Sequence, residues 1–354
     1  MNRTLLAAAS VVALVALAAC GDNQGEAAQG ARAGVWAAGS STVFPFTTRV
    51  AENFARTSGG AAPRVESLGT GGGIQAFCQG VGSNTPDIAN ASRRMKKSEF
   101  EMCQKNGVTD IVELKIGYDG LVIATALDAP NYGFAGDDLY LALAKEVPGP
   151  NGTFIANPNT TWNQVNPGLP ATRIMVYGPP PTSGTRDSWL ELAMAPSAEA
   201  IPALAALADS DEDRFETLAH TLREDGGWID SGENDNAIVQ TLTRTPGSTG
   251  VFGYSFLEQN SDSVKAHSVN GVMPTPETIA SGAYPISRSM YIYVKKAHVG
   301  VTPGLKEFVM EYMSDASAGR GGYLQDRGLV PLPADQLAAQ RAAAVALTPM
   351  ASPE

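Results

Sequence analysis

The length, composition and charge of the chain limit what it can be. It has 354 residues, of which 44% are hydrophobic and 17% charged, which is enough apolar sequence for two globular domains. Its net charge of −11 argues against a nucleic-acid partner and against binding to an anionic membrane surface. A buried anion site remains compatible with this charge, because surface charges are screened beyond about 8 Å at physiological salt.

The N-terminus has the features of an export signal. A positively charged start is followed by an apolar run at 5–17 that is too short to be a stable membrane anchor. The small residues before Cys20 resemble a bacterial lipoprotein signal, in which that cysteine is lipidated, and plain cleavage near Ala19 is the alternative. We therefore expect a signal peptide at 1–20, a flexible tether at 21–34, and an exported protein of the periplasm or cell envelope that touches the membrane only through a lipid anchor.

The other cysteines, Cys78 and Cys103, predict a disulfide, because exported proteins work where disulfides persist. Two buried free thiols are the alternative. The histidines, His220, His267 and His298, are scattered without the spacing of metal ligands, so we expect neither a metal nor a cofactor.

Two early segments predict helices that begin with hydroxyl or glycine residues. Residues 38–46 predict a short strand, a Ser/Ser/Thr turn and a helix with Pro45 in its first turn. Residues 65–73 predict a strand and a glycine-rich loop, with Thr70 in it, that leads into a second helix. This loop matches neither nucleotide-binding glycine motif, but its backbone N–H groups can converge on an oxyanion.

Two further segments precede the middle of the chain. Residues 87–94 predict a short strand with Ser92 and Arg93 at its end, although arginines are more often solvated than bound to a ligand. Residues 111–126 predict two apolar strands joined by a glycine-flanked pivot at 117–120, which suits a crossing between two domains.

The segment 174–188 has the clearest pattern of an anion site. It predicts a strand, a proline run and a helix that begins at Ser183-Gly184-Thr185. The first turn of a helix has free N–H groups and partial positive charge, and Gly184 lets a ligand approach them. The fork of Arg186 can hold two oxygens of a tetrahedral anion. An ordinary capped helix is the alternative.

The C-terminal part predicts a return crossing and the elements that follow it. Residues 250–256 predict a glycine-bounded strand that leads back to the first domain. We expect a strand at 290–294, a helix at 302–313 and a surface helix at 334–346.

Six short motifs, in order from about residue 36 to 330, resemble those of the phosphate-binding proteins of bacterial Pst-type ABC importers. They are Gly39–Pro45, Gly69–Gly73, Asn90–Arg93, Ser183–Asp187, Gly250–Phe256 and Tyr284–Arg288. The resemblance implies an α/β, type II-like periplasmic-binding-protein fold, in which two lobes joined by two hinge crossings close over phosphate. It places lobe I at 35–117 and 254–354, and lobe II at 118–253.

The resemblance also implies which residues bind phosphate. They are Ser41, Thr42, Val43, Thr70, Gly71, Arg93, Ser183, Gly184, Thr185 and Arg186. The best-known members have an arginine before Ser-Gly-Thr, where this chain has 178–181, so Arg186 is the expected substitute. They also have an aspartate where this chain has Arg93, so we expect another acceptor, Asp119 or Asp235, to distinguish phosphate from sulfate.

Together these patterns predict a monomeric receptor that binds inorganic phosphate and delivers it to the permease subunits of an ABC importer. No catalysed reaction is expected, because neither a histidine nor a pair of carboxylates accompanies Ser183 in the sequence. A receptor for sulfate, molybdate or an organic phosphate is the first alternative, and a phosphatase is the second.

Overall fold

The computed structural model of the chain describes residues 34–59, 62–232 and 235–353. The predicted signal peptide, the lipidation site Cys20 and the tether up to residue 33 lie outside these ranges. Within them, no single helix has the length and apolar content needed to cross a membrane, although the bent pair 184–199 and 202–210 reaches both when counted together.

Strands and helices alternate along the described residues. The strands are β1 Trp36–Gly39, β2 Arg64–Ser67, β3 Ile88–Ala91, β4 Ile111–Ala126, β5 Gly133–Phe134, β6 Glu146–Pro148, β7 Phe154–Ala156, β8 Val176–Gly178, β9 Trp228–Asp230, β10 Thr249–Gly253, β11 Val264–Ala266, β12 Ser268–Val269 and β13 Ser287–Lys295. The helices are α1 Phe44–Ser58, α2 Gly69–Phe77, α3 Lys97–Lys105, α4 Asp138–Leu143, α5 Trp162–Val165, α6 Gly184–Trp189, α7 Ala195–Glu199, α8 Pro202–Ser210, α9 Glu212–His220, α10 Asp235–Arg244, α11 Tyr254–Gln259, α12 Pro276–Ala280, α13 Leu305–Tyr312, α14 Asp315–Ala318 and α15 Ala334–Ala346.

One mixed sheet organises the fold. In the described part of the chain its nine strands follow the order β2-β1-β3-β13-β4-β10-β8-β9, with β11 paired to β4. Strands β1, β2 and β3 are parallel to one another, and β8 is parallel to β9 and β10, as in sheets whose strands are linked by helices.

The long strand β4 belongs to both halves of this sheet. Its residues 111–120 pair with β13, and its residues 121–124 pair with β10. The prediction of two strands and a pivot was therefore wrong. Gly117 serves close packing instead of a turn, because a Cβ there would lie 2.6 Å from a side-chain carbon of Leu329.

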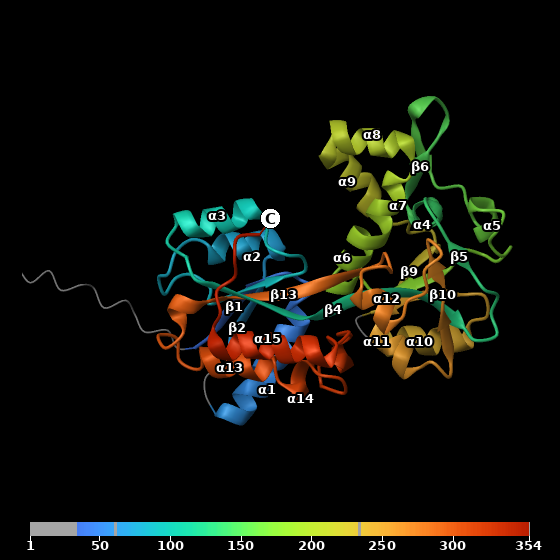
Figure 1. The fold of residues 1–354 in the computed structure, drawn as a ribbon. Coiled ribbons are helices and arrows are strands. Elements are labelled where there is room, and N and C mark those ends of the chain that lie inside the picture. Colours follow the sequence, from blue (N-terminus) through green and yellow to red (C-terminus); the bar gives the residue numbers. More distant parts are fainter. Residues whose placement is uncertain (1–33, 60–61, 233–234, 354) are drawn as a thin grey trace, which may run out of the picture.

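Helices cover both faces of the sheet in each lobe (Figure 1). In the part around β1, β2 and β3, which we call the first lobe, α2 and α3 lie on one face and α1, α13 and α15 on the other. In the part around β8, β9 and β10, the second lobe, α6 to α9 lie on one side and α10 and α11 on the other. The predicted two-lobed α/β fold is thus confirmed.

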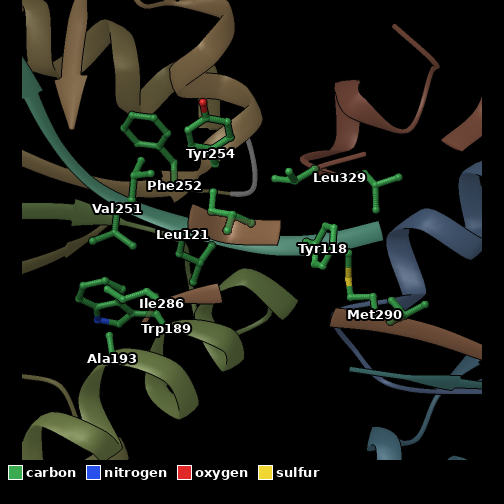
Figure 2. Close-up of a cluster of buried hydrophobic side chains, with 14 of the residues drawn as sticks. Tyr118, Leu121, Trp189, Ala193, Val251, Phe252, Tyr254, Ile286, Met290 and Leu329 are labelled. Carbon is green, nitrogen blue, oxygen red and sulfur yellow. The ribbon is translucent and has the colours of Figure 1, made fainter. Parts of the chain in front are cut away.

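A cluster of buried hydrophobic side chains follows β4 from one lobe into the other. Figure 2 shows Tyr118 on the side of Met290 and Leu329, and Leu121 on the side of Val251. All five are at most 3% exposed. Strand β4 therefore contributes to the core of both lobes without a break, and its residues between the lobes lie on a continuous, well-packed strand.

Most of the local predictions are confirmed. Helix α1 has Pro45 in its first turn and buries Phe46 and Val50, and α13, α15 and β13 fall within two or three residues of their predicted bounds. The glycine-rich segment differs slightly, because α2 begins at its first residue and the glycines form the first turn. The predicted disulfide between Cys78 and Cys103 joins the end of α2 to α3.

Candidate anion-binding site

A cleft of about 830 Å³ lies between the lobes, where α1, α6 and α10 begin. The polar residues that line it are Ser41, Thr42, Ser67, Asp119, Thr182, Ser183, Thr185, Asp235, Asn236, Asp326 and Arg327. Helical backbone continues from α6 through a π-helical turn into α7, so the α6 start carries the dipole of a longer helix. Several helix N-termini that face one cleft favour an anion there.

The starts of α1 and α6 meet across the cleft. Ser41 Oγ donates a hydrogen bond to Asp187 Oδ2 at 2.7 Å, and Thr42 Oγ1 lies 3.2 Å from Ser188 Oγ. Their approach requires a glycine at 184, because a Cβ there would lie 2.6 Å from the Ser41 carbonyl oxygen. The two predicted loops therefore form one site that combines both lobes.

The α6 start is capped as its sequence predicts. Ser183 Oγ accepts a hydrogen bond from the Thr185 N–H at 3.2 Å, and both residues line the cleft together with Gly184. In the first lobe, Val43 is fully buried behind this lining, and its N–H donates to Ser40 Oγ at 3.3 Å. Thus Ser41, Thr42, Ser183, Gly184 and Thr185 are brought together, and Val43 lies directly behind them.

Two buried acids supply acceptors in the same cleft. Asp119 on β4 is 7% exposed. Burial raises the pKa of its carboxyl group, while the charge of Arg288 acts in the opposite direction. Asp235 begins α10, and its Oδ2 accepts a hydrogen bond from the Gly253 N–H at 3.2 Å. The cleft can therefore bind an anion that also carries a proton.

The third predicted group lies elsewhere in the first lobe. Among the described residues that line the cleft, Thr70, Gly71 and Arg93 are absent. Thr70 Oγ1 accepts a hydrogen bond from the Ser92 N–H at 3.2 Å, and Arg93 donates to both Glu99 carboxylate oxygens at 2.7 and 2.9 Å. These polar groups bond to each other within one lobe.

No group of three or more His, Cys, Asp or Glu side chains in the described part of the chain is arranged to hold a metal ion. His267 is buried against Thr125 at 2.9 Å, and His298 is buried against Asp87 at 2.7 Å. Both histidines therefore belong to the core.

Comparison with known proteins places this cleft in a family. Residues 24–316 match the PBP superfamily domain. The chain belongs to the PBP superfamily. It is 30% identical over 335 residues to the phosphate-binding protein PstS of Staphylococcus saprophyticus, which covers 93% of this chain and 90% of that protein. It is 32% identical over 314 residues to protein SphX of Synechococcus elongatus, with 86% and 79% covered.

Solved structures of phosphate-binding proteins agree with the fold. A possible phosphate binding protein from Planctomyces limnophilus superposes with a TM-score of 0.68 at 26% identity, over 88% of this chain and 98% of that chain. PstS from Borrelia burgdorferi superposes with a TM-score of 0.53 at 19% identity, over 84% and 98%, which supports the fold alone. These matches span both lobes.

In this PBP-superfamily chain, Arg186 is held away from the cleft lining. Its Nη1 donates to the Pro179 carbonyl oxygen at 3.0 Å and to Asp230 Oδ1 at 2.9 Å, and its guanidinium lies 4.8 Å from the centre of the Trp228 ring. A phosphate-binding role for Arg186 remains a prediction, and it would require this ion pair to open.

Two other arginines lie close to the site, and neither is among the residues predicted to bind phosphate. Arg288 lies opposite Asp119 in the β4–β13 pairing and contacts both the α1 loop and α6. Arg327, in the 3₁₀ turn Gln325–Arg327, is exposed and lines the cleft. The motif Tyr284–Arg288 indicated that Arg288 could belong to the site, whereas no motif around Arg327 indicated such a role.

Proposed function

We propose that this protein is a receptor for inorganic phosphate and that the cleft between its lobes is the binding site. The observation that carries this proposal is the meeting of two hydroxyl-bearing helix starts, from different lobes, beside a buried carboxyl group. Phosphate fits this chemistry because its oxygens accept hydrogen bonds and its protonated oxygen donates one. The PstS relative, named as phosphate-binding and aligned over most of both chains, supports the same ligand.

The donors of the site come from both lobes. We assign Ser41 and Thr42 from the first lobe, and Ser183 with its two following residues from the second. The Val43 N–H would join them by giving up its hydrogen bond to Ser40 Oγ. Hydroxyl groups and N–H groups at helix starts bind oxyanions without a full countercharge, because the helix dipole contributes partial positive charge. Arg327 adds a full positive charge at the cleft.

Thr70, Gly71, Arg93 and Arg186 belong to the proposal as outer members of the site. Each would need a different side-chain or loop position to touch an anion in the cleft, because their polar groups bond to neighbours or lie outside its lining. Ser67, the last residue of β2, lies just before α2 and lines the cleft.

Asp119 is the proposed acceptor for the proton of phosphate. Its Oδ2 is buried without a hydrogen-bond partner among the described residues, and Asp119 lines the cleft. Sulfate has no proton near neutral pH, so it would meet a carboxylate it cannot pair with, at a cost of about 1–3 kcal/mol or more. Asp235 is the second candidate, although its Oδ2 already accepts a backbone hydrogen bond.

Closure around the anion would use the strands shared by the lobes. We propose that the chain passes from the first lobe to the second along β4 and returns along β13. The return comes after β11 and β12, because these strands pair with the second-lobe end of β4 and with β5. The predicted division is therefore approximate. It assigns 35–117 and 254–354 to lobe I and 118–253 to lobe II. Binding shifts the population toward a closed form that a partner can recognise.

The cellular role follows from the family. The match to the PBP superfamily and to a protein named phosphate-binding PstS supports the resemblance to the binding proteins of Pst-type ABC importers. The proposed partners are therefore the permease subunits, the proposed location is the periplasm or cell envelope, and no catalysed reaction is proposed. Lipid attachment at Cys20 and a monomeric state complete the proposal.

Titration calorimetry of the mature protein with phosphate, arsenate, sulfate and molybdate tests the function. We expect phosphate and its close analogue arsenate to bind, and sulfate and molybdate to bind at least about tenfold more weakly. No release of phosphate from a generic phosphate ester is expected above background. Equal affinity for phosphate and sulfate, or hydrolysis of the ester, would contradict the proposal.

Competition between phosphate and sulfate in Asp119→Asn and Asp235→Asn identifies the acceptor. An amide can donate to sulfate where the carboxylate repels it, so the variant that loses selectivity marks the residue that senses the proton. We expect this of Asp119→Asn. Unchanged selectivity in both variants would remove the acceptor role from both residues.

A further inference from the structure

Arg288 lies at the junction of the two helix starts that form the proposed site. It is the second residue of β13, and its side chain is 12% exposed. Nη2 donates to Thr42 Oγ1 and to Ser188 Oγ, both at 2.7 Å, and Nη1 pairs with Glu191. Nε lies 3.6 Å from Asp119 Oδ2. One side chain thus contacts the α1 loop, the α6 region and the proposed acceptor.

The hydrogen-bonding capacity of these groups decides which way the hydroxyl protons point. A guanidinium has only donors, so Thr42 Oγ1 and Ser188 Oγ must both accept from Arg288. Ser188 Oγ donates its own proton to the Gly184 carbonyl oxygen at 3.0 Å. The proton of Thr42 is then directed to Ser188 Oγ at 3.2 Å, to the Gly184 carbonyl oxygen at 3.5 Å or to an acceptor in the cleft.

We propose that Arg288 is a positioning residue, which orients Thr42 as a hydrogen-bond donor to the bound anion and ties the α1 loop to α6 when the lobes close. This inference rests on the proposed function. It assigns Arg288 no contact with the anion, because the guanidinium lies behind Thr42 and Asp119, which line the cleft.

Two features distinguish this role from that of an ordinary buried ion pair. The contacts of Arg288 reach residues that precede α1 and residues in and just after α6, so they bridge elements of different lobes. Arg288 also faces two carboxylates, Asp119 and Glu191, so its charge is compensated before any anion binds. Its contribution therefore lies in geometry more than in net charge.

The test compares Arg288→Gln and Arg288→Ala with the parent in calorimetric titrations with inorganic phosphate. We expect Arg288→Ala to weaken binding by about 30-fold or more, and Arg288→Gln, which keeps an amide donor, to weaken it less. Arg223→Ala is the matched control, because Arg223 is also buried and ion-paired, to Asp225, but is not among the residues that line the cleft. It should lower the melting temperature and leave phosphate affinity unchanged.

A double-mutant cycle separates positioning from structural support. If Arg288 acts through Thr42, the losses in Thr42→Val and Arg288→Gln should not add in the double variant. Additive losses, or an Arg288→Gln affinity within about twofold of the parent, would overturn the inference. A parent protein that fails to bind phosphate would instead overturn the proposed function.

Discussion

The α1–α6 junction and the α2–β3 junction are built from the same kinds of residue but differ in where their partners come from. At the α2–β3 junction, Thr70 bonds to Ser92 and Arg93 pairs with Glu99, all within the first lobe. At the α1–α6 junction, Thr42 and Arg288 bond to residues of the second lobe. Contacts within one lobe add to its stability, whereas contacts between lobes form and break as the lobes move, and only these can be coupled to a ligand.

The acids of the two junctions differ in the same way. Burial raises the pKa of Glu99, but hydrogen bonds from Arg93 and from the Lys96 N–H outweigh it, so the net pKa lies below its usual value. For Asp119 burial dominates, and the net pKa is raised. In the folded protein the Glu99 carboxylate accepts hydrogen bonds from Arg93 and from the Lys96 N–H, whereas Asp119 Oδ2 has no hydrogen-bond partner among the described residues.

The largest effect on stability is expected from the disulfide beside the α2–β3 junction. Replacement of both Cys78 and Cys103 by serine should lower the free energy of unfolding by roughly 3 kcal/mol, because the unfolded chain regains the freedom of the closed loop. Urea unfolding measures this loss. Phosphate affinity at a temperature where the variant is folded should change by less than about twofold. A large loss of affinity would mean that the α2 region is coupled to the ligand after all.

Gly184→Val tests the α1–α6 junction directly. Its side chain would overlap the Ser41 carbonyl where the two helix starts meet, and relief of such overpacking costs about 2 kcal/mol, or roughly a 30-fold loss of phosphate affinity. Gly72→Ala is the matched control in α2, where an added Cβ meets only the Leu68 Cβ, at an ordinary contact distance of 3.5 Å. It should keep the affinity and raise stability slightly. If only the α2 variant lost affinity, the α2–β3 junction, and not the α1–α6 junction, would be coupled to the ligand.

Thr42→Val and Thr70→Val compare two threonines that the sequence treats alike. We expect Thr42→Val to reduce phosphate affinity about tenfold, since it removes one donor, and to change stability little. Thr70→Val should cost about 1 kcal/mol of stability, because the Ser92 N–H loses its acceptor, and affinity should change less than in Thr42→Val. Equal losses of affinity would place Thr70 on the ligand.

The smallest effect is a pH dependence from Glu99. A carboxyl group with a lowered pKa in the folded state contributes stability above its unfolded pKa, and this contribution disappears as the pH falls through the folded value. Glu99→Gln should therefore be less stable than the parent near pH 7, with a difference that shrinks below about pH 4.5. Unfolding free energies at several pH values measure it. Glu101→Gln, an exposed change on the same helix, should leave the profile unaltered.

Local features of the chain were predictable from the sequence. Helix starts such as Pro45 in α1 and Ser183 before α6 depend on neighbouring residues, so their residue types suffice to place them. The disulfide was predictable because compartment and cysteine count leave one pairing once Cys20 is set aside.

Features that depend on long-range contact were not predictable. Arg186 adjoins the Ser-Gly-Thr motif in sequence, yet Asp230 and Trp228 draw its side chain to the other side of the helix start. Arg288 contacts Thr42 across 246 positions of sequence, and no local pattern encodes that distance. Gly117, predicted to break a strand, instead lets Leu329 pack closely against it.

The position of β13 has a consequence for how the chain reaches this fold. This strand lies between β3 and β4 in the sheet, although residues 287–295 are made long after both of its neighbours. Because the chain is made from its N-terminus, β13 cannot join β3 to β4 until residues 287–295 have been made. Pairings between strands that lie far apart in the sequence also form slowly. The order of synthesis therefore delays completion of the first lobe until nearly the whole chain has been made.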